Sequence, residues 1–184
     1  MTEFGRGASQ IRTWTGSRGD VEIGDNGSMG KPFPQIIAAI EEFAATAPDL
    51  HSIQEFSVKL IGQRLPYYNW VGFYMIDPED PDILVLGPFH GAPTEHVRIP
   101  VSQGICGAAV AQGETVIVDD VTADPRYLAC SIETRSEIVV PIRANGRIVG
   151  EIDIDSHDLN AFRDEDRSFL EKFAGIFGKL LEKD

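Results

Sequence analysis

A cysteine and several carboxylates gather in the last third of this sequence, and their residue types could do chemistry together. Cys130 lies in a mainly polar segment, Glu137 follows it, and Asp153 and Asp155 come a little later. A cysteine thiolate is a soft nucleophile. Carboxylates that lie side by side split their pKa values, so that one of them can keep its proton near neutral pH. These residues could therefore supply both a nucleophile and an acid to one reaction.

A β-hairpin is predicted to carry the carboxylates. Two runs of strand-forming residues, 136–142 and 148–156, flank the pair Asn145-Gly146. An Asn-Gly pair between such runs is typical of a hairpin, because both turn residues must accept a positive φ. Cys130 comes shortly before the first of these strands.

The return strand of this hairpin is unusually acidic on one face. Side chains alternate along a strand, so Glu151, Asp153 and Asp155 share one face, and the isoleucines between them share the other. A row of carboxylates is destabilising unless a cation meets it or one group keeps its proton. The alternative interpretation is a solvated outer face. Glu151 has no predicted role, and we expect it to face solvent.

The second cysteine, Cys106, lies in a glycine-rich turn and short helix that we expect over residues 102–111, closed by Gly113. The first turn of a helix lowers the pKa of a thiol, which favours reactivity. The alternative is a small buried residue packed among glycines and alanines. Cys130, in a loop, has the stronger indication of a functional role.

Motifs of several other enzyme classes are missing from the sequence. It contains no Cys-x-x-Cys pair, and the spacing of His90, His96, Cys106 and Cys130 does not favour a metal site. It also lacks a phosphate-binding loop with its lysine, a Gly-x-Ser-x-Gly motif and a His-Glu-x-x-His motif. The sequence therefore predicts neither a metal nor a cofactor.

Helical and strand patterns predict a single α+β domain. The expected helices cover residues 33–45, 52–64 and 164–182, and the expected strands cover 69–76, 83–87, 96–99, 115–118, 136–142 and 148–156, with a 3₁₀-like turn at 126–128. About six antiparallel strands would form one sheet, with the N- and C-terminal helices on one face. We expect a ligand pocket on the other face.

Composition and charge limit the classes of partner. The chain has 184 residues, 42% of them hydrophobic, and a formal net charge of −13, which suits one globular domain. The acidic balance argues against nucleic acid and anionic membranes. No apolar run approaches the ~20 residues that span a bilayer. Two cysteines are too few for a disulfide scaffold, so we expect a cytoplasmic protein.

Residues 1–28 differ from the rest of the chain. They are rich in glycine, serine, threonine and arginine and have no sustained period, a composition typical of a disordered tail. Gly27-Ser28-Met29 resembles a cloning junction, which favours an expression leader, and a natural extension is the alternative. In both cases the folded domain is expected over residues 29–184.

Seven short blocks, taken in order, resemble the free methionine-(R)-sulfoxide reductases, a family of GAF-domain enzymes. The blocks are WVGFY at 70–74, LGPF at 86–89, RIPV at 98–101, GICGAAV at 104–110, LAC at 128–130, SEIVVP at 136–141 and DIDS at 153–156. The resemblance runs from about Pro34 to the C-terminus. It implies a GAF domain, the reduction of the R sulfoxide of free methionine with reducing equivalents from thioredoxin, and a homodimer.

The resemblance also implies roles for individual residues. Reducing a sulfoxide needs a soft nucleophile at sulfur and a proton at oxygen, which a thiolate and a neutral carboxyl supply. The product on the enzyme is a sulfenic acid, which a second thiol converts to a disulfide. Cys130 matches the catalytic cysteine, Glu137, Asp153 and Asp155 match the carboxylates that hold the substrate and polarise its sulfoxide, and Trp70 and Tyr74 match the aromatic residues that wall the pocket.

One position departs from the family pattern. The family has three cysteines, and the first, which commonly resolves the catalytic one, should stand where this sequence has His96. Cys106 matches the second. Our hypothesis is that Cys106 resolves Cys130 here. The alternatives are direct attack by an external thiol, or a loss of recycling that leaves a non-catalytic GAF domain binding a small ligand for sensing.

Overall fold

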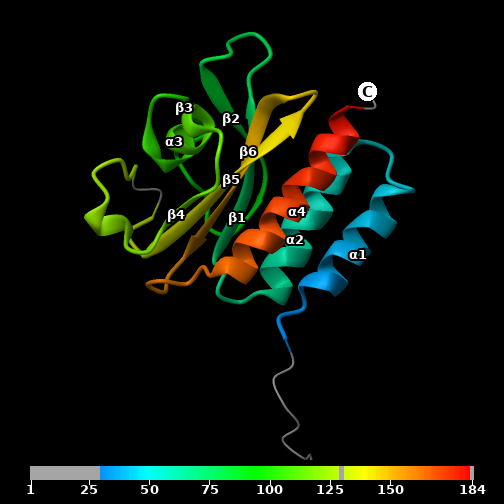
Figure 1. Ribbon diagram of the computed structural model, residues 1–184, viewed down its shortest axis with the longest axis horizontal. Helices are drawn as coiled ribbons and strands as arrows, with labels where there is room; N and C mark the ends of the chain where they lie inside the picture. The colour runs from blue at the N-terminus through cyan, green and yellow to red at the C-terminus, as the bar shows by residue number, and fades with distance from the viewer. Residues whose placement is uncertain (1–29, 129–130, 183–184) are drawn as a thin grey trace, which may run out of the picture. The chain divides into compact units, whose positions relative to one another are not determined.

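The described residues form a sheet of six antiparallel strands in the order β3-β2-β1-β6-β5-β4 (Figure 1). The computed structural model describes residues 30–128 and 131–182. The strands are β1 (Trp70–Ile76), β2 (Ile83–His90), β3 (Arg98–Pro100), β4 (Val116–Val118), β5 (Ser136–Ala144) and β6 (Arg147–Ser156). The expected tail, residues 1–28, lies outside the described residues, so the division of the chain near residue 29 stays a prediction.

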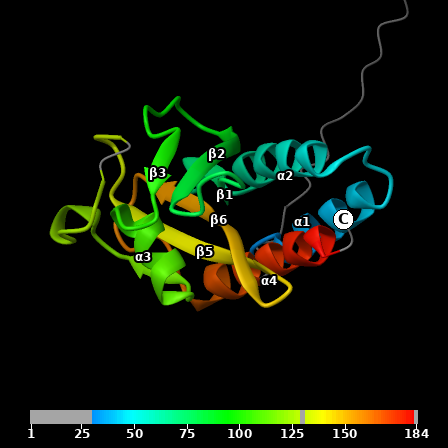
Figure 2. The same ribbon diagram turned by 90° about the horizontal axis from the view of Figure 1, so that it is seen from above.

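In the part of the chain that the structure describes, helices lie on both faces of the sheet (Figure 2). The helices are α1 (Phe33–Ala44), α2 (Leu50–Arg64), α3 (Gly104–Gln112) and α4 (Asp164–Leu181). The apolar stripes of α1, α2 and α4 pack on one core, which includes Val71, Phe73 and Ile154 of the sheet. Helix α3 packs on a second core, with Trp70 and Tyr74. The predicted α+β architecture is confirmed.

Alternation along β1 explains why two cores exist. Val71 and Phe73 point to the three-helix face, and Trp70 and Tyr74 point to the α3 face. Both sets are apolar or aromatic, as in a central strand that is covered on both sides. The pairing of β1 with β2 and β6 places it in the interior of the sheet.

The hairpin forms as expected. β5 and β6 pair along nearly their whole length, and the turn residues Asn145 and Gly146 have φ values of 50° and 75°. The αL conformation also closes α3, where Gly113 has φ 69°. Helix α3 packs on the face of the sheet that carries the β6 carboxylates.

Element boundaries differ from expectation in a few places. Helix α2 begins at Leu50 because the Asp49 carboxylate accepts a hydrogen bond from the Ser52 N–H at 2.7 Å. The 3₁₀ turn expected at 126–128 is wrong: the 3₁₀ turn is η1 (Val121–Ala123), where Asp120 caps the Thr122 N–H. No helix in the described part of the chain is long and apolar enough to cross a membrane.

Candidate functional site

The candidate site lies on the α3 face of the sheet, where the register of three strands brings the sequence-predicted residues together. On β6, Asp155 lies opposite Trp70 of β1 and Glu137 of β5. Two residues back, Asp153 lies opposite Gly72. Because each of these pairs is on one face, the strands assemble two distant sequence blocks into one cluster.

Aromatic side chains wall the site on the β1 side. The Trp70 and Tyr74 rings stack with centroids 6.2 Å apart, and the Phe89 and Trp70 rings stack with centroids 5.6 Å apart. The indole N–H of Trp70 donates to the Ala92 carbonyl at 3.0 Å. Gly72 makes room for this arrangement, because a Cβ there would lie 2.2 Å from the Trp70 ring.

His96, which stands where the family pattern has a cysteine, contacts this aromatic wall. The Tyr74 hydroxyl donates to the backbone carbonyl of His96 at 2.8 Å, and the His96 N–H donates to Thr94 Oγ1 at 3.1 Å. The chain at residue 96 is therefore held against the aromatic wall, and a residue at this position borders the candidate site.

Four carboxylates are buried on this face. Glu137, Asp153 and Asp155 are 5%, 2% and 4% exposed, and Glu151 is fully buried. The expectation that Glu151 faces solvent is wrong, because α3 covers the sheet face that Glu151 shares with Asp153 and Asp155. Strand alternation could have indicated this burial from the sequence, since it already placed Glu151 on the same face as Asp153.

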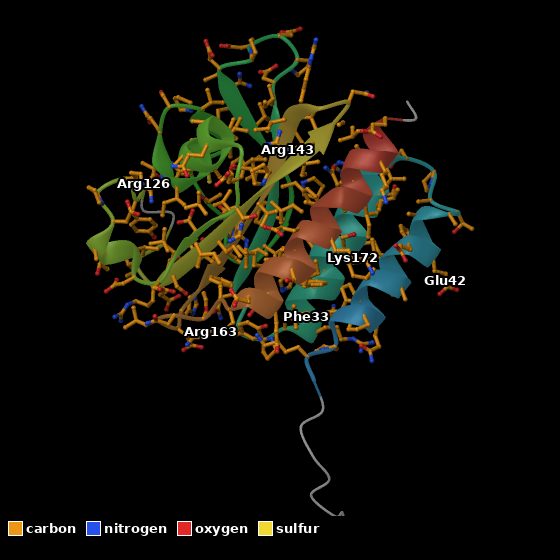
Figure 3. All side chains as sticks on the ribbon, viewed as in Figure 1. Phe33, Glu42, Arg126, Arg143, Arg163 and Lys172 are labelled. Carbon is orange, nitrogen blue, oxygen red and sulfur yellow. The ribbon has the colours of Figure 1, made fainter. Side chains whose placement is uncertain are left out.

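No basic side chain in the described part of the chain forms an ion pair with these four groups. Among the residues that the structure describes, none of the salt bridges reaches them. Arg126, Arg143 and Arg163 lie exposed on separate parts of the surface (Figure 3). Arg126 binds the Asp124 carboxylate and Arg143 donates to the Gly113 carbonyl. Arg126 interacts with Glu137 through its charge but without a salt bridge, so the described part of this face has no ion pair of its own.

Burial raises the pKa values of these four carboxyl groups. Desolvation raises the pKa of Asp153 to about 8, with a further contribution from Glu151, and desolvation raises the pKa of Glu151 to about 8. The pKa values of Glu137 and Asp155 are also raised, first by desolvation and then by the charge of Asp153. Such a cluster holds protons near neutral pH, as an acid catalyst requires.

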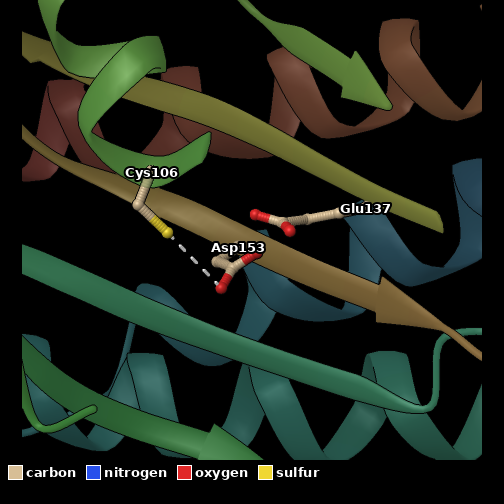
Figure 4. Close-up of side chains that lie close together, drawn as sticks. All are labelled: Cys106, Glu137 and Asp153. Atoms are coloured by element: carbon tan, nitrogen blue, oxygen red, sulfur yellow. Dashed lines mark hydrogen bonds between the residues drawn. The ribbon is translucent and has the colours of Figure 1, made fainter. Parts of the chain in front are cut away.

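Cys106 projects from α3 into this cluster (Figure 4). Its side chain is 5% exposed, and its thiol donates a hydrogen bond to Asp153 Oδ2 at a distance of 3.7 Å. Burial raises the pKa of this thiol, and the charges of Asp153, Glu151 and Glu137 raise it further. The expected lowering by the helix N-terminus is therefore wrong, because desolvation and three carboxylates outweigh the helix dipole.

Cys130 lies outside the described residues, so its predicted role stays a prediction. The residues on either side of this gap border two small cavities. Leu128 lines one of about 10 Å³ together with Cys106 and Glu137, and Ser131 lines one of about 80 Å³ together with Trp70 and Asp155. The larger groove, about 420 Å³ between α4 and β5, contains none of the predicted site residues.

One set of atoms here could contact a metal ion. Ligand atoms of Cys106, Glu137 and Asp153 lie within 4.8 Å of one another. Three such groups can bind a divalent cation, but the same geometry serves a thiol and two carboxyls that share protons. His51 is exposed on α2 and does not belong to this set.

Comparison with known proteins agrees with this arrangement. A model of the GAF domain family matches residues 47–182. The protein YtsP of Bacillus subtilis is 39% identical over 85% of this chain and 94% of its own. The free methionine-R-sulfoxide reductase of Escherichia coli is 35% identical over 83% of this chain and 86% of its own. The solved structure of the free methionine-R-sulfoxide reductase from Neisseria meningitidis, in complex with its substrate, superposes with a TM-score of 0.77 at 38% identity, covering 82% of this chain and 88% of that one.

Proposed function

Since this chain belongs to the GAF-domain family of free methionine-R-sulfoxide reductases, we propose that it is an oxidoreductase that transfers oxygen from free methionine-(R)-sulfoxide to its own cysteine. The observation that carries the proposal is the set of buried, proton-holding carboxyls on β5 and β6 beside an aromatic wall. A sulfoxide is a weak electrophile, and it becomes reactive when an acid protonates its oxygen.

The first half-reaction uses Cys130 as the nucleophile. The Cys130 thiolate attacks the substrate sulfur, and Asp153 gives its proton to the sulfoxide oxygen. The protonated oxygen then passes to the Cys130 sulfur: the substrate S–O bond and the new bond between the two sulfurs break as the S–O bond on Cys130 forms, so methionine leaves and Cys130 becomes a sulfenic acid. Sulfur of the substrate is reduced by two electrons, and the Cys130 sulfur is oxidised by two.

The remaining groups position the substrate. The S-methyl group of methionine sulfoxide is apolar, and the rings of Trp70 and Tyr74 offer it an apolar wall. An ionised carboxylate among Glu137 and Asp155 would meet the ammonium group of a free amino acid. That ammonium would form an ion pair that the described part of this face lacks, and it would lower the electrostatic cost of the cluster.

Cys106 is the proposed resolving thiol. It attacks the sulfur of the Cys130 sulfenic acid, a disulfide forms, and hydroxide leaves as water. The Cys106 thiol donates to Asp153 Oδ2, so a base stands ready to accept its proton. We further propose that thioredoxin reduces this disulfide, that the enzyme is a homodimer, and that it works in the cytoplasm.

The experiment that tests this function uses the two cysteines separately. Purified protein is mixed with racemic free methionine sulfoxide and a dithiol, and loss of each isomer is followed by chiral separation. We expect loss of the R isomer alone, no turnover in Cys130→Ser, and one turnover per chain without thioredoxin recycling in Cys106→Ser. Binding of the R isomer with no loss of it would refute the reductase and favour a sensing domain.

The resolving step has its own test. After one turnover without reductant, the disulfide is mapped by protease digestion and mass spectrometry. A Cys106–Cys130 bond is expected. A stable sulfenic acid on Cys130 with Cys106 still reduced would show instead that an external thiol attacks directly.

A further inference from the structure

The side chain of Asn69 holds the end of the strand that carries Asp155. Its Oδ1 accepts a hydrogen bond from the His157 N–H at 2.8 Å, and its backbone N–H donates to the Asp155 carbonyl at 2.9 Å. Asn69 therefore binds the chain on both sides of Ser156, the residue at which β6 ends. The reaction proposed above gives Asn69 no part.

The end of the strand pairing explains why an amide is useful here. Trp70 and Asp155 are the last paired residues of β1 and β6, so His157 lies beyond the paired part of these strands. A backbone N–H needs an acceptor, and the oxygen of an amide side chain can supply one. On the β5 side, the Arg135 N–H donates to the Ser156 carbonyl at 2.8 Å. Asn69 supplies the corresponding bond on the β1 side.

This bond lies at the edge of the candidate site. Asn69, Trp70, Asp155 and His157 line the same cavity of about 80 Å³. The Trp70 ring has an anchor of its own, because its indole N–H donates to the Ala92 carbonyl at 3.0 Å. The bond from His157 to Asn69 therefore acts mainly on the segment that follows Asp155.

We propose that Asn69 is a positioning residue, which fixes the Asp155 carboxyl beside the Trp70 ring for contact with the ammonium group of the substrate. The inference rests on the proposed function, in which an ionised carboxylate among Glu137 and Asp155 meets that ammonium. Asn69 acts through the backbone of β6, and it does so without touching the substrate.

Loss of the Asn69 oxygen should affect binding more than chemistry. Asp155 is 4% exposed and lies in the last pair of β6, so a shift of the chain beyond it moves its carboxyl. The proton donor Asp153 lies two residues back and is paired with both Gly72 and Val139, which hold it in place. An ammonium contact exists in the ground state and in the transition state alike, so its loss raises KM and leaves kcat nearly unchanged.

A substrate without an amino group gives the most specific readout. The analogue of methionine sulfoxide with hydrogen in place of the α-amino group keeps the sulfoxide, the S-methyl group and the carboxylate. The wild type should reduce this analogue less efficiently than free methionine-(R)-sulfoxide. If Asn69 acts through Asp155, Asn69→Ala should lose efficiency on the amino acid and very little on the analogue. A residue that only stabilises the fold would lower both.

Steady-state kinetics of the full chain with a dithiol can test this role. kcat and KM for the R isomers of both compounds are measured for the wild type, Asn69→Ala and Asn69→Asp, the last of which keeps an acceptor oxygen. Asp49→Ala is the matched control, because it also removes one acceptor of a backbone N–H, that of Ser52 at 2.7 Å, at the start of α2. Each variant is first checked for the wild-type circular dichroism spectrum.

In Asn69→Ala we expect KM for free methionine-(R)-sulfoxide to rise at least about fivefold, with kcat within about twofold of the wild type. kcat/KM for the analogue should stay within about twofold. Asn69→Asp should keep KM for the amino acid within about twofold, since it still accepts from the His157 N–H. Asp49→Ala should match the wild type with both compounds.

Three results would overturn the inference. One is a KM in Asn69→Ala within about twofold of the wild type, which would mean that water replaces the Asn69 oxygen. Another is an equal loss of kcat/KM on both compounds, which would mean that Asn69 only supports the fold. The third is an Asn69→Asp variant as poor as Asn69→Ala. A wild type that reduces neither compound would instead overturn the proposed function itself, and the two failures are therefore distinguishable.

Discussion

Replacing Glu151 by glutamine should make the fold less sensitive to pH. Glu151 is fully buried and desolvation raises its pKa from 4.5 to about 8. Between these two values the folded state holds a proton that the unfolded chain has released. Raising the pH across this window therefore favours unfolding, and the loss of stability is complete only above the folded pKa.

The size of the effect follows from the shift. Each pH unit above 4.5 costs about 1.4 kcal/mol of unfolding free energy until the folded pKa is reached. The cost is about 1 kcal/mol at pH 5.5 and about 3 kcal/mol at pH 7, a difference of about 2 kcal/mol. Glutamine cannot ionise, so Glu151→Gln loses this slope. The charge of Glu151 also raises the pKa of Asp153. Removing that charge therefore reduces the pH dependence of the free energy of unfolding further.

Urea unfolding at pH 5.5 and pH 7, followed by circular dichroism, measures the change. The free energy of unfolding of Glu151→Gln relative to the wild type should rise by about 2 kcal/mol between the two pH values. Glu171→Gln is a control that should show no change between the two pH values, because Arg167 lowers the pKa of Glu171 and the group is ionised at both. A Glu151→Gln difference that moves by less than about 0.5 kcal/mol would refute the assignment of a buried, protonated Glu151.

Three further predictions concern the site. Gly72→Ala places a Cβ 2.2 Å from the Trp70 ring, so it should shift the tryptophan fluorescence and lower kcat/KM at least about tenfold, which corresponds to about 1.4 kcal/mol. Gly175→Ala is the control, because a Cβ at this exposed position of α4 meets nothing within 4 Å. It should leave activity unchanged and add about 0.5–1 kcal/mol of stability. Tyr74→Phe removes the bond to the His96 carbonyl and should cost about 1 kcal/mol in urea unfolding, and an unchanged midpoint would show that water satisfies that carbonyl. In Cys130→Ser, iodoacetamide should label Cys106 more slowly than in the urea-unfolded chain at pH 8, because burial raises the pKa of its thiol, and equal rates would contradict that environment.

Local patterns in the sequence were enough for most of the fold. The Asn145-Gly146 pair identified the hairpin, because only a few residue types accept positive φ at both turn positions. The apolar stripe of α4 and the two apolar faces of β1 were equally visible, since each element buries one side or both. Strand ends and the 3₁₀ turn were less visible, because they depend on single caps such as Asp120.

The partners of the carboxylates depended on tertiary structure. The sequence by itself determined which residues are acids and that Glu151, Asp153 and Asp155 share a face, because strand alternation is a local property. Only the fold decided that α3 would cover that face, that Cys106 would donate to Asp153, and that Glu151 would lose all contact with water. Burial and neighbouring charge, which set whether a carboxyl is a surface anion or a stored proton, arise from segments distant in the chain.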